Sequence, residues 1–231
     1  MVPAIQTRTN LLTIIGQVNV PSTAIPKVSP RLPIAAREQR CTKEQVDLSR
    51  QYNAALHETW FPITELSQVD LNLAALTPGL RTVGPIQFDV RGVIQLRRAA
   101  MLWDWGWSVF PERVSIPVGT RCGRFHVLHG AMYAQGFGRQ VGTYRLHYSD
   151  GTEHSFPVQL GRDVEDWSWP PSSPGAMTPA WQTVDPSNPS QFLRLYAQTF
   201  VNPQPDREVS SLEFISTLSD AGPFLVALTI E

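Results

Sequence analysis

The sequence contains little charge of either sign and little cysteine. Charged residues make up 17% of its 231 positions, the formal net charge is −1, and no basic run or acidic tail occurs. Steering towards nucleic acid or an anionic membrane is therefore not indicated. The two cysteines, Cys41 and Cys122, form no C-x-x-C pair, so no structural zinc site is expected. Two buried free thiols are favoured over a disulfide, which an oxidising compartment would allow.

The chain also lacks the sequence features of membrane segments and of common catalytic sites. No apolar run reaches the length of a membrane span, so none is predicted. The apolar patch at 11–15 follows no basic start and precedes no expected cleavage site, so no signal peptide is predicted. The motifs G-x-S-x-G, G-x-G-x-x-G and H-E-x-x-H and the P-loop are absent. We therefore expect a protein that is not an enzyme.

Proline and tryptophan are abundant, with 20 and 7 residues, and strand-like alternation recurs between turn signals. Residues 43–56 fit a short helix or an irregular edge segment, which is favoured, and 66–80 allow one helical turn at most. Residues 170–190 are predicted to be a loop. The predicted strands are 82–83, 86–96 with a bulge at Gly92, 112–117, 124–129, 144–148, 154–160, 192–200, 209–218 and 223–230. This pattern predicts an all-β fold, a jelly-roll β-sandwich or a related sandwich. The last strand, FLVALTI, is apolar on both faces, as in a central strand.

The clearest predicted hairpin surrounds the turn sequence Ser149-Asp150-Gly151. A two-residue turn would mismatch the apolar faces of its two strands. A three-residue loop, with Gly151 in a left-handed conformation, instead places Tyr144 opposite Phe156. The same register places His147 opposite Glu153 on the polar face.

Residues 1–45 contain five prolines and no sustained hydrophobic period. They are predicted to form a Pro-rich extended arm or linker that lies on a surface, because they cannot form a core of their own. Residues 46–231 are predicted to form the β-sandwich domain.

Several segments together resemble a known family of modules. They are VDLSRQYNAAL, GLRTVGPIQFDVRGVIQL, ERVSIPVGTRCGRFHVLHGA, GTYRLHYSDGTEHSFPVQLGRDVEDW, FVNPQPDREVSSLEFIST and PFLVALTIE. Their order over residues 46–231 resembles galactose-binding-like, carbohydrate-binding-module-like jelly rolls in multidomain proteins of planctomycete and verrucomicrobial bacteria. The resemblance implies the fold more firmly than a function. The compartment stays open, with an extracytoplasmic location slightly favoured. The segment Thr199–Pro203 stands where the family often has a tryptophan, so a ligand contact at that point does not carry over.

Two groups of residues are candidates for ligand binding. Trp103, Trp105 and Trp107 would lie on one side of an extended segment, where indoles can stack on sugar rings. The alternative, that they pack over an open end of the sandwich, is favoured. The loop 161–169 combines acids with indoles, a combination that suits sugar hydroxyls or Ca²⁺. Its candidates are Asp163, Asp166, Trp167 and Trp169, with Glu165 beside them.

The favoured alternative for this loop is structural, with Asp163 capping a turn and Arg162 pairing with a neighbouring acid. The resemblance makes a structural Ca²⁺ plausible, but the spacing D-x-E-D lacks a calcium-loop signature, so no cofactor is predicted. A metal site shared by His126, His129, His147 and His154 is not expected either. His147 and His154 point to opposite faces in the matched register, and the other two diverge along their strand.

Two functions remain open. The first is a non-catalytic binding module that recognises a glycan or another extracytoplasmic polymer through loops at one end of the sandwich. The second is a structural or assembly subunit, in which the arm 1–45 docks on a neighbouring protein chain. The aromatic and acidic loops favour the first function, and the apolar but aperiodic arm motivates the second.

Overall fold

The computed structural model describes residues 29–60, 71–99, 109–170, 177–185 and 188–231. Within these residues the regular structure is β-strand, and no α-helix occurs. The strands are β1 (Ala54–Ala55), β2 (Gly79–Val83), β3 (Ile86–Val90), β4 (Gly92–Gln95), β5 (Arg113–Arg121), β6 (Arg124–Met132), β7 (Gln140–Tyr148), β8 (Glu153–Gln159), β9 (Trp181–Asp185), β10 (Asn188–Val201), β11 (Glu208–Ser216) and β12 (Gly222–Ile230).

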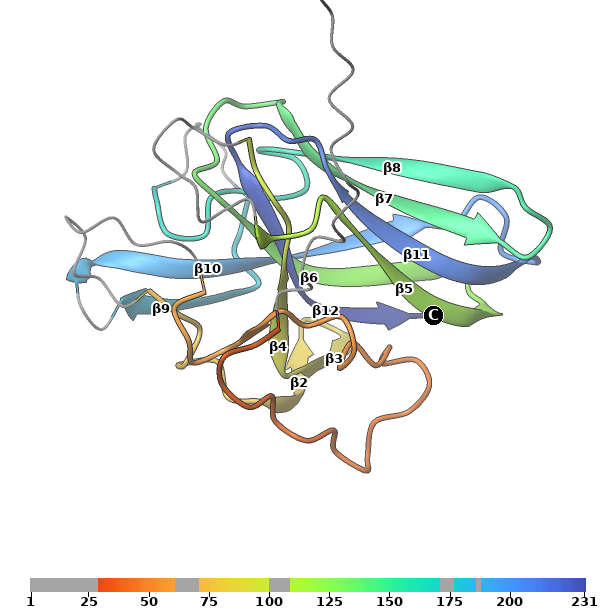
Figure 1. The fold of residues 1–231 in the computed structure, drawn as a ribbon, viewed down its shortest axis with the longest axis horizontal. Coiled ribbons are helices and arrows are strands. Elements are labelled where there is room, and N and C mark those ends of the chain that lie inside the picture. The colour runs from red at the N-terminus through yellow and green to blue at the C-terminus, as the bar shows by residue number, and fades with distance from the viewer. Residues whose placement is uncertain (1–28, 61–70, 100–108, 171–176, 186–187) are drawn as a thin grey trace, which may run out of the picture.

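The described strands form three antiparallel sheets. The six-stranded sheet has the order β1-β4-β12-β6-β10-β9, the four-stranded sheet β5-β11-β7-β8, and the small sheet is the hairpin β2-β3. The two larger sheets curl and lie against each other (Figure 1), with β11 central in one and β12 central in the other. The predicted all-β sandwich is therefore confirmed.

The six-stranded sheet buries both of its faces, because a separate core lies on each side. One core fills the space between the two large sheets and contains Val127, Tyr144 and Leu225. The other lies on the opposite face, beneath the hairpin β2-β3, and contains Leu128 and Phe224. Alternate residues of β6 thus enter different cores, as the two-residue period of a strand requires. In β12 the alternation shifts at an irregularity between Leu225 and Ala227, where Val226 and Ala227 both enter the second core. The prediction that FLVALTI is a central strand is confirmed.

The hairpin β7-β8 has the predicted register. Tyr144 pairs with Phe156 and His147 with Glu153. The backbone N–H of Tyr148 donates to the carbonyl of Thr152 at 2.9 Å, which leaves Ser149, Asp150 and Gly151 as the loop. Gly151 has φ +85°, the left-handed conformation predicted from the matching of the apolar faces.

Two predictions about strands are wrong. Residues 86–96 are not one bulged strand, because the chain breaks at Arg91 and continues from β3 into β4 in a different sheet. Gly92 is needed there for close approach, since a Cβ would lie 2.7 Å from the Tyr52 ring. Residues 170–190 are not all loop either, because they contain β9. This strand lies at the edge of its sheet, where nearby prolines are tolerated because an edge strand needs hydrogen bonds on one side only.

The described part of the predicted arm, residues 29–45, lies on the arm's own domain. Arg37 forms an ion pair with the buried carboxylate of Asp89 at 3.1 Å, and Gln45 forms a β-bridge with Thr229. Residues 1–28 lie outside the described residues. The segment 43–56 is irregular apart from the two residues of β1, as favoured from the sequence. Cys41 and Cys122 carry free thiols.

Candidate ligand-binding site

The loop 161–169 leaves the hairpin β7-β8 and crosses to the start of β10. Strand β10 pairs with β6 only from Tyr196 onward. Before Tyr196, β10 bonds to this loop instead of to β6: the Trp167 carbonyl accepts the backbone N–H of Arg194 at 2.7 Å. The backbone N–H of Trp167 in turn donates to the carbonyl of Ala131 at 2.9 Å. The end of the loop is thereby fixed beside the first half of β10.

Asp163 is a structural residue of this loop. Its side chain is buried, and its carboxylate accepts the backbone N–H of Gln159 at 2.8 Å and the Nε–H of Arg162 at 2.9 Å. It therefore caps a turn and pairs with Arg162, the interpretation favoured from the sequence. Little acceptor capacity is left for a ligand.

Asp166 is the residue that shapes the end of the loop. Its Oδ1 accepts the backbone N–H groups of Ser168 at 2.9 Å and Trp169 at 2.8 Å, and its Oδ2 accepts that of Ala134 at 2.7 Å. Burial raises the pKa of Asp166, and these hydrogen bonds counteract that rise. Asp166 thus acts as a positioning residue, which fixes the backbone on which Trp169 stands.

Glu165 is buried without full compensation. Only 2% of the residue is exposed, and its Oε1 accepts no hydrogen bond from the described residues. Burial raises the pKa of the Glu165 carboxyl, and the nearby charge of Asp166 adds to the rise. An ionised Glu165 is therefore a cost to the folded state.

The two tryptophans of the loop have opposite environments. Trp167 is buried in the second core, with its ring centroid 5.4 Å from that of Trp60 and 5.8 Å from that of Phe224. Trp169 is 47% exposed. Of the candidates from the sequence that the structure describes, Trp169 is the one that presents its side chain to solvent.

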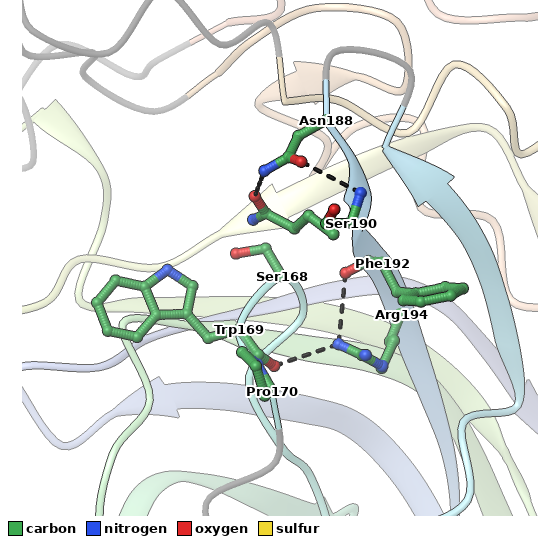
Figure 2. A pocket seen from close by; sticks show the side chains of 8 residues that line it. Ser168, Trp169, Pro170, Asn188, Ser190, Phe192 and Arg194 are labelled. Atoms are coloured by element: carbon green, nitrogen blue, oxygen red, sulfur yellow. Dashed lines mark hydrogen bonds between the residues drawn. The ribbon is translucent and has the colours of Figure 1, made fainter.

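Trp169 stands between two hollows. The larger, of about 330 Å³, separates Trp169 from the start of β10, and Figure 2 shows Phe192 and Arg194 on its far side. The smaller, of about 50 Å³, lies between Trp169 and Tyr133. Both Phe192 and Tyr133 belong to the exposed large apolar residues of the chain. Trp169 therefore lines both hollows, with Phe192 at the larger one and Tyr133 at the smaller one.

Polar groups line the larger hollow as well. The Arg194 guanidinium lies 5.5 Å from the Phe192 ring centroid and donates to the Trp169 carbonyl at 3.2 Å. Asn188 and Gln191 line the larger hollow, and their amides are linked by a 3.4 Å hydrogen bond. The surface thus combines flat apolar faces with amide and guanidinium groups that can bind hydroxyl oxygens.

The remaining candidates do not join this surface. Trp103, Trp105 and Trp107 lie outside the described residues. His129 is buried, where its Nε2 lies 2.8 Å from the Asp163 carbonyl and burial lowers its pKa to about 4. In the described ranges, no group of three His, Cys, Asp or Glu side chains could hold a metal ion.

Sequence reasoning missed Asn188, Gln191 and Arg194. Asn188 fell within the predicted loop 170–190, Gln191 lay between that loop and the predicted strand 192–200, and Arg194 lay in the predicted strand but was not identified as a site residue. The alternation of Phe192 and Arg194 with Leu193 was the available signal, since Leu193 is buried and the other two are not.

Comparisons with known proteins add no relative: no family model matches the chain, and no curated protein is significantly similar to it. Within the described ranges, no helix has the length and apolar character needed to cross a membrane.

Proposed function

We propose that this chain is a non-catalytic binding module, a galactose-binding-like jelly roll that recognises a glycan or another extracytoplasmic polymer. The single observation that supports the proposal most is Trp169, a half-exposed indole between two hollows on a rigid sandwich. Its proposed contact surface consists of Trp169, Phe192, Arg194 and the amides of Asn188 and Gln191. Asp163, Asp166 and Trp167 support this surface from inside and do not contact the ligand.

The chemistry of the surface suits a sugar ring. One face of a pyranose carries mainly C–H groups, which stack on the flat indole of Trp169. The ring hydroxyls then lie at the edge of the stack, within reach of groups that donate and accept hydrogen bonds, such as the amides of Asn188 and Gln191. Asp166 fixes the backbone of Trp169, so little conformational freedom is lost when a ligand binds.

Tryptophan fluorescence during titration with a panel of soluble polysaccharides tests the proposal. We expect at least one polysaccharide to change the emission saturably, and we expect Trp169→Ala to weaken that binding by about tenfold or more, as for the loss of a central aromatic contact. Binding of the variant is measured by calorimetry, because the substitution also removes an emitter.

Phe137→Ala is the matched control for this experiment. Phe137 is 69% exposed, more than Trp169, and it lines neither hollow. Its replacement should leave polysaccharide binding unchanged. A wild-type protein that binds no member of a broad panel, or a Trp169→Ala variant that binds as the wild type does, would contradict the proposal.

A further inference from the structure

A second pocket lies beside the hairpin β2-β3 and shares no lining residue with the two hollows at Trp169. It has a volume of about 680 Å³ and is bordered by the β2-β3 turn, the start of β6 and the second half of β10. Its apolar wall includes Pro85, Ile86 and Pro179, and its polar side includes Arg124, His126 and Glu231. The surface proposed above uses none of these residues, so this pocket can be considered independently of it.

His126 is a buried side chain at this pocket with one unsatisfied nitrogen. It pairs with Thr199 across β6 and β10, and its Nδ1 lies 2.8 Å from the Thr199 hydroxyl. The side chain is only 5% exposed, and its Nε2 has no hydrogen-bond partner within the described part of the chain. The contact at Nδ1 orients the ring. A buried polar nitrogen without a partner is costly, unless a ligand satisfies it.

One carboxylate oxygen already occupies the position that His126 and Arg124 share. The Oε2 atom of Glu231 lies 3.2 Å from the Arg124 Nη1 and 3.4 Å from the His126 Nε2. The first contact is a hydrogen bond, whereas the second lacks hydrogen-bond geometry. The position therefore accepts an acidic oxygen, but Glu231 fills it imperfectly.

Glu231 can leave this position without disturbing the sheet. Its backbone is held by three hydrogen bonds with Gly123 and Arg124, so only its side chain has to rotate. The side chains of Glu231 and Arg124 are 58% and 57% exposed, and an ion pair so exposed to water stabilises a protein little.

From this geometry we propose that the pocket binds a small organic carboxylate, whose acidic group replaces the Glu231 side chain between Arg124 and His126. The Arg124 guanidinium and the His126 Nε2–H donate to the ligand carboxylate, and the Thr199 hydroxyl keeps the imidazole in that tautomer. The organic part of the ligand packs against Pro85, Ile86 and Pro179. Glu231 is then an internal competitor that occupies the site in the free protein.

Titration of ¹⁵N-histidine-labelled protein with sodium butyrate at pH 7.5 tests the proposal, with sodium chloride holding the ionic strength constant. The imidazole signals of His126 are assigned by their loss in His126→Gln. We expect a saturable shift of its Nε2 signal. Glu231→Gln, which removes the competitor, should bind butyrate more tightly, and Arg124→Gln should bind it about tenfold more weakly or not at all.

The opposite signs expected for Glu231→Gln and Arg124→Gln distinguish a ligand site from a structural ion pair. The control is Asp220→Asn, since Asp220 forms an equally long 3.2 Å pair with Arg139, which does not border this pocket. That variant should bind butyrate as the wild type does. The proposal is overturned if neither the wild type nor Glu231→Gln shows a saturable shift, if Arg124→Gln binds equally well, or if inorganic phosphate binds and butyrate does not.

Discussion

The hairpin β7-β8 and the loop that follows it are adjacent in sequence but are held in place by different kinds of contact. In the hairpin, the residues that decide the structure are close in sequence: Gly151 sets the turn, and Tyr144 meets Phe156 across it. In the loop 161–169, the deciding partners are distant in sequence, such as Trp60 for Trp167 and Ala134 for Asp166. The hairpin is scaffold that its own sequence specifies, whereas the surface around Trp169 depends on how the whole domain packs.

The largest expected effect comes from breaking the hairpin's contact with the core. Tyr144 is fully buried, stacks on Phe214 at 4.8 Å and contacts His129 through its hydroxyl at 3.1 Å. Tyr144→Ala should lower the free energy of unfolding by about 4 kcal/mol, since it removes an aromatic ring from a packed core. Urea denaturation measures this loss. Tyr144→Phe, which keeps the ring, should lose only about 1 kcal/mol; equal losses in the two variants would show that the ring is not the main contribution.

The next effect concerns the loop. Asp166→Asn should lower the free energy of unfolding by about 2 kcal/mol, because an amide can accept hydrogen bonds with only one of its two polar atoms. Either the Ala134 N–H or the pair from Ser168 and Trp169 then loses its acceptor. Denaturation measures the loss, and the same variant should weaken polysaccharide binding at Trp169. Unchanged stability would mean that the loop is held mainly by its other contacts.

A smaller effect is expected at the hairpin turn. Gly151 has φ +85°, and a Cβ placed there meets no atom within 4 Å. Gly151→Ala should therefore lower the free energy of unfolding by about 1 kcal/mol, through backbone strain alone. Gly151→Asn should cost less, because asparagine tolerates the left-handed conformation better. Thermal unfolding of both variants tests this order; a reversed order would argue against strain as the cause.

The smallest effect depends on pH and concerns Glu165. Its pKa is raised in the folded state above the ordinary value of 4.5, so its contribution to stability is fully present below pH 4.5 and is lost as the pH rises through the folded-state pKa. Glu165→Gln removes this loss. The melting temperature of the variant relative to wild type should therefore increase from pH 4 to pH 7. A difference that stays constant over this range would show that Glu165 titrates normally.

The sequence predicted those parts of the molecule whose cause is local. Alternation and one glycine were enough for the register of β7-β8, and the apolar faces of FLVALTI were enough for the central position of β12. The pairing of Asp163 with Arg162 was also foreseeable, since the two are neighbours.

The parts that could not be predicted have causes distant in sequence. Trp167 and Trp169 are two positions apart in the same loop, so alternation alone cannot distinguish them. Trp167 is buried because it packs against Trp60 and Phe224, whereas Trp169 is exposed. The break at Arg91 likewise depends on the approach of Tyr52 to Gly92. The hollow beside Trp169 requires the start of β10, which the prolines around β9 concealed.

The positions of β11 and β12 have a consequence for how the protein folds during synthesis. Each is central in its sheet, yet they are the last two strands in chain order. Until residues 208–230 have emerged from the ribosome, β5 has no partner strand, and β4, β6 and β7 each have one unpaired edge. Such late, long-range pairing slows folding and exposes edges to aggregation. Truncation before β12 should thus leave a nascent chain that needs chaperones, however well its hairpin β7-β8 forms alone.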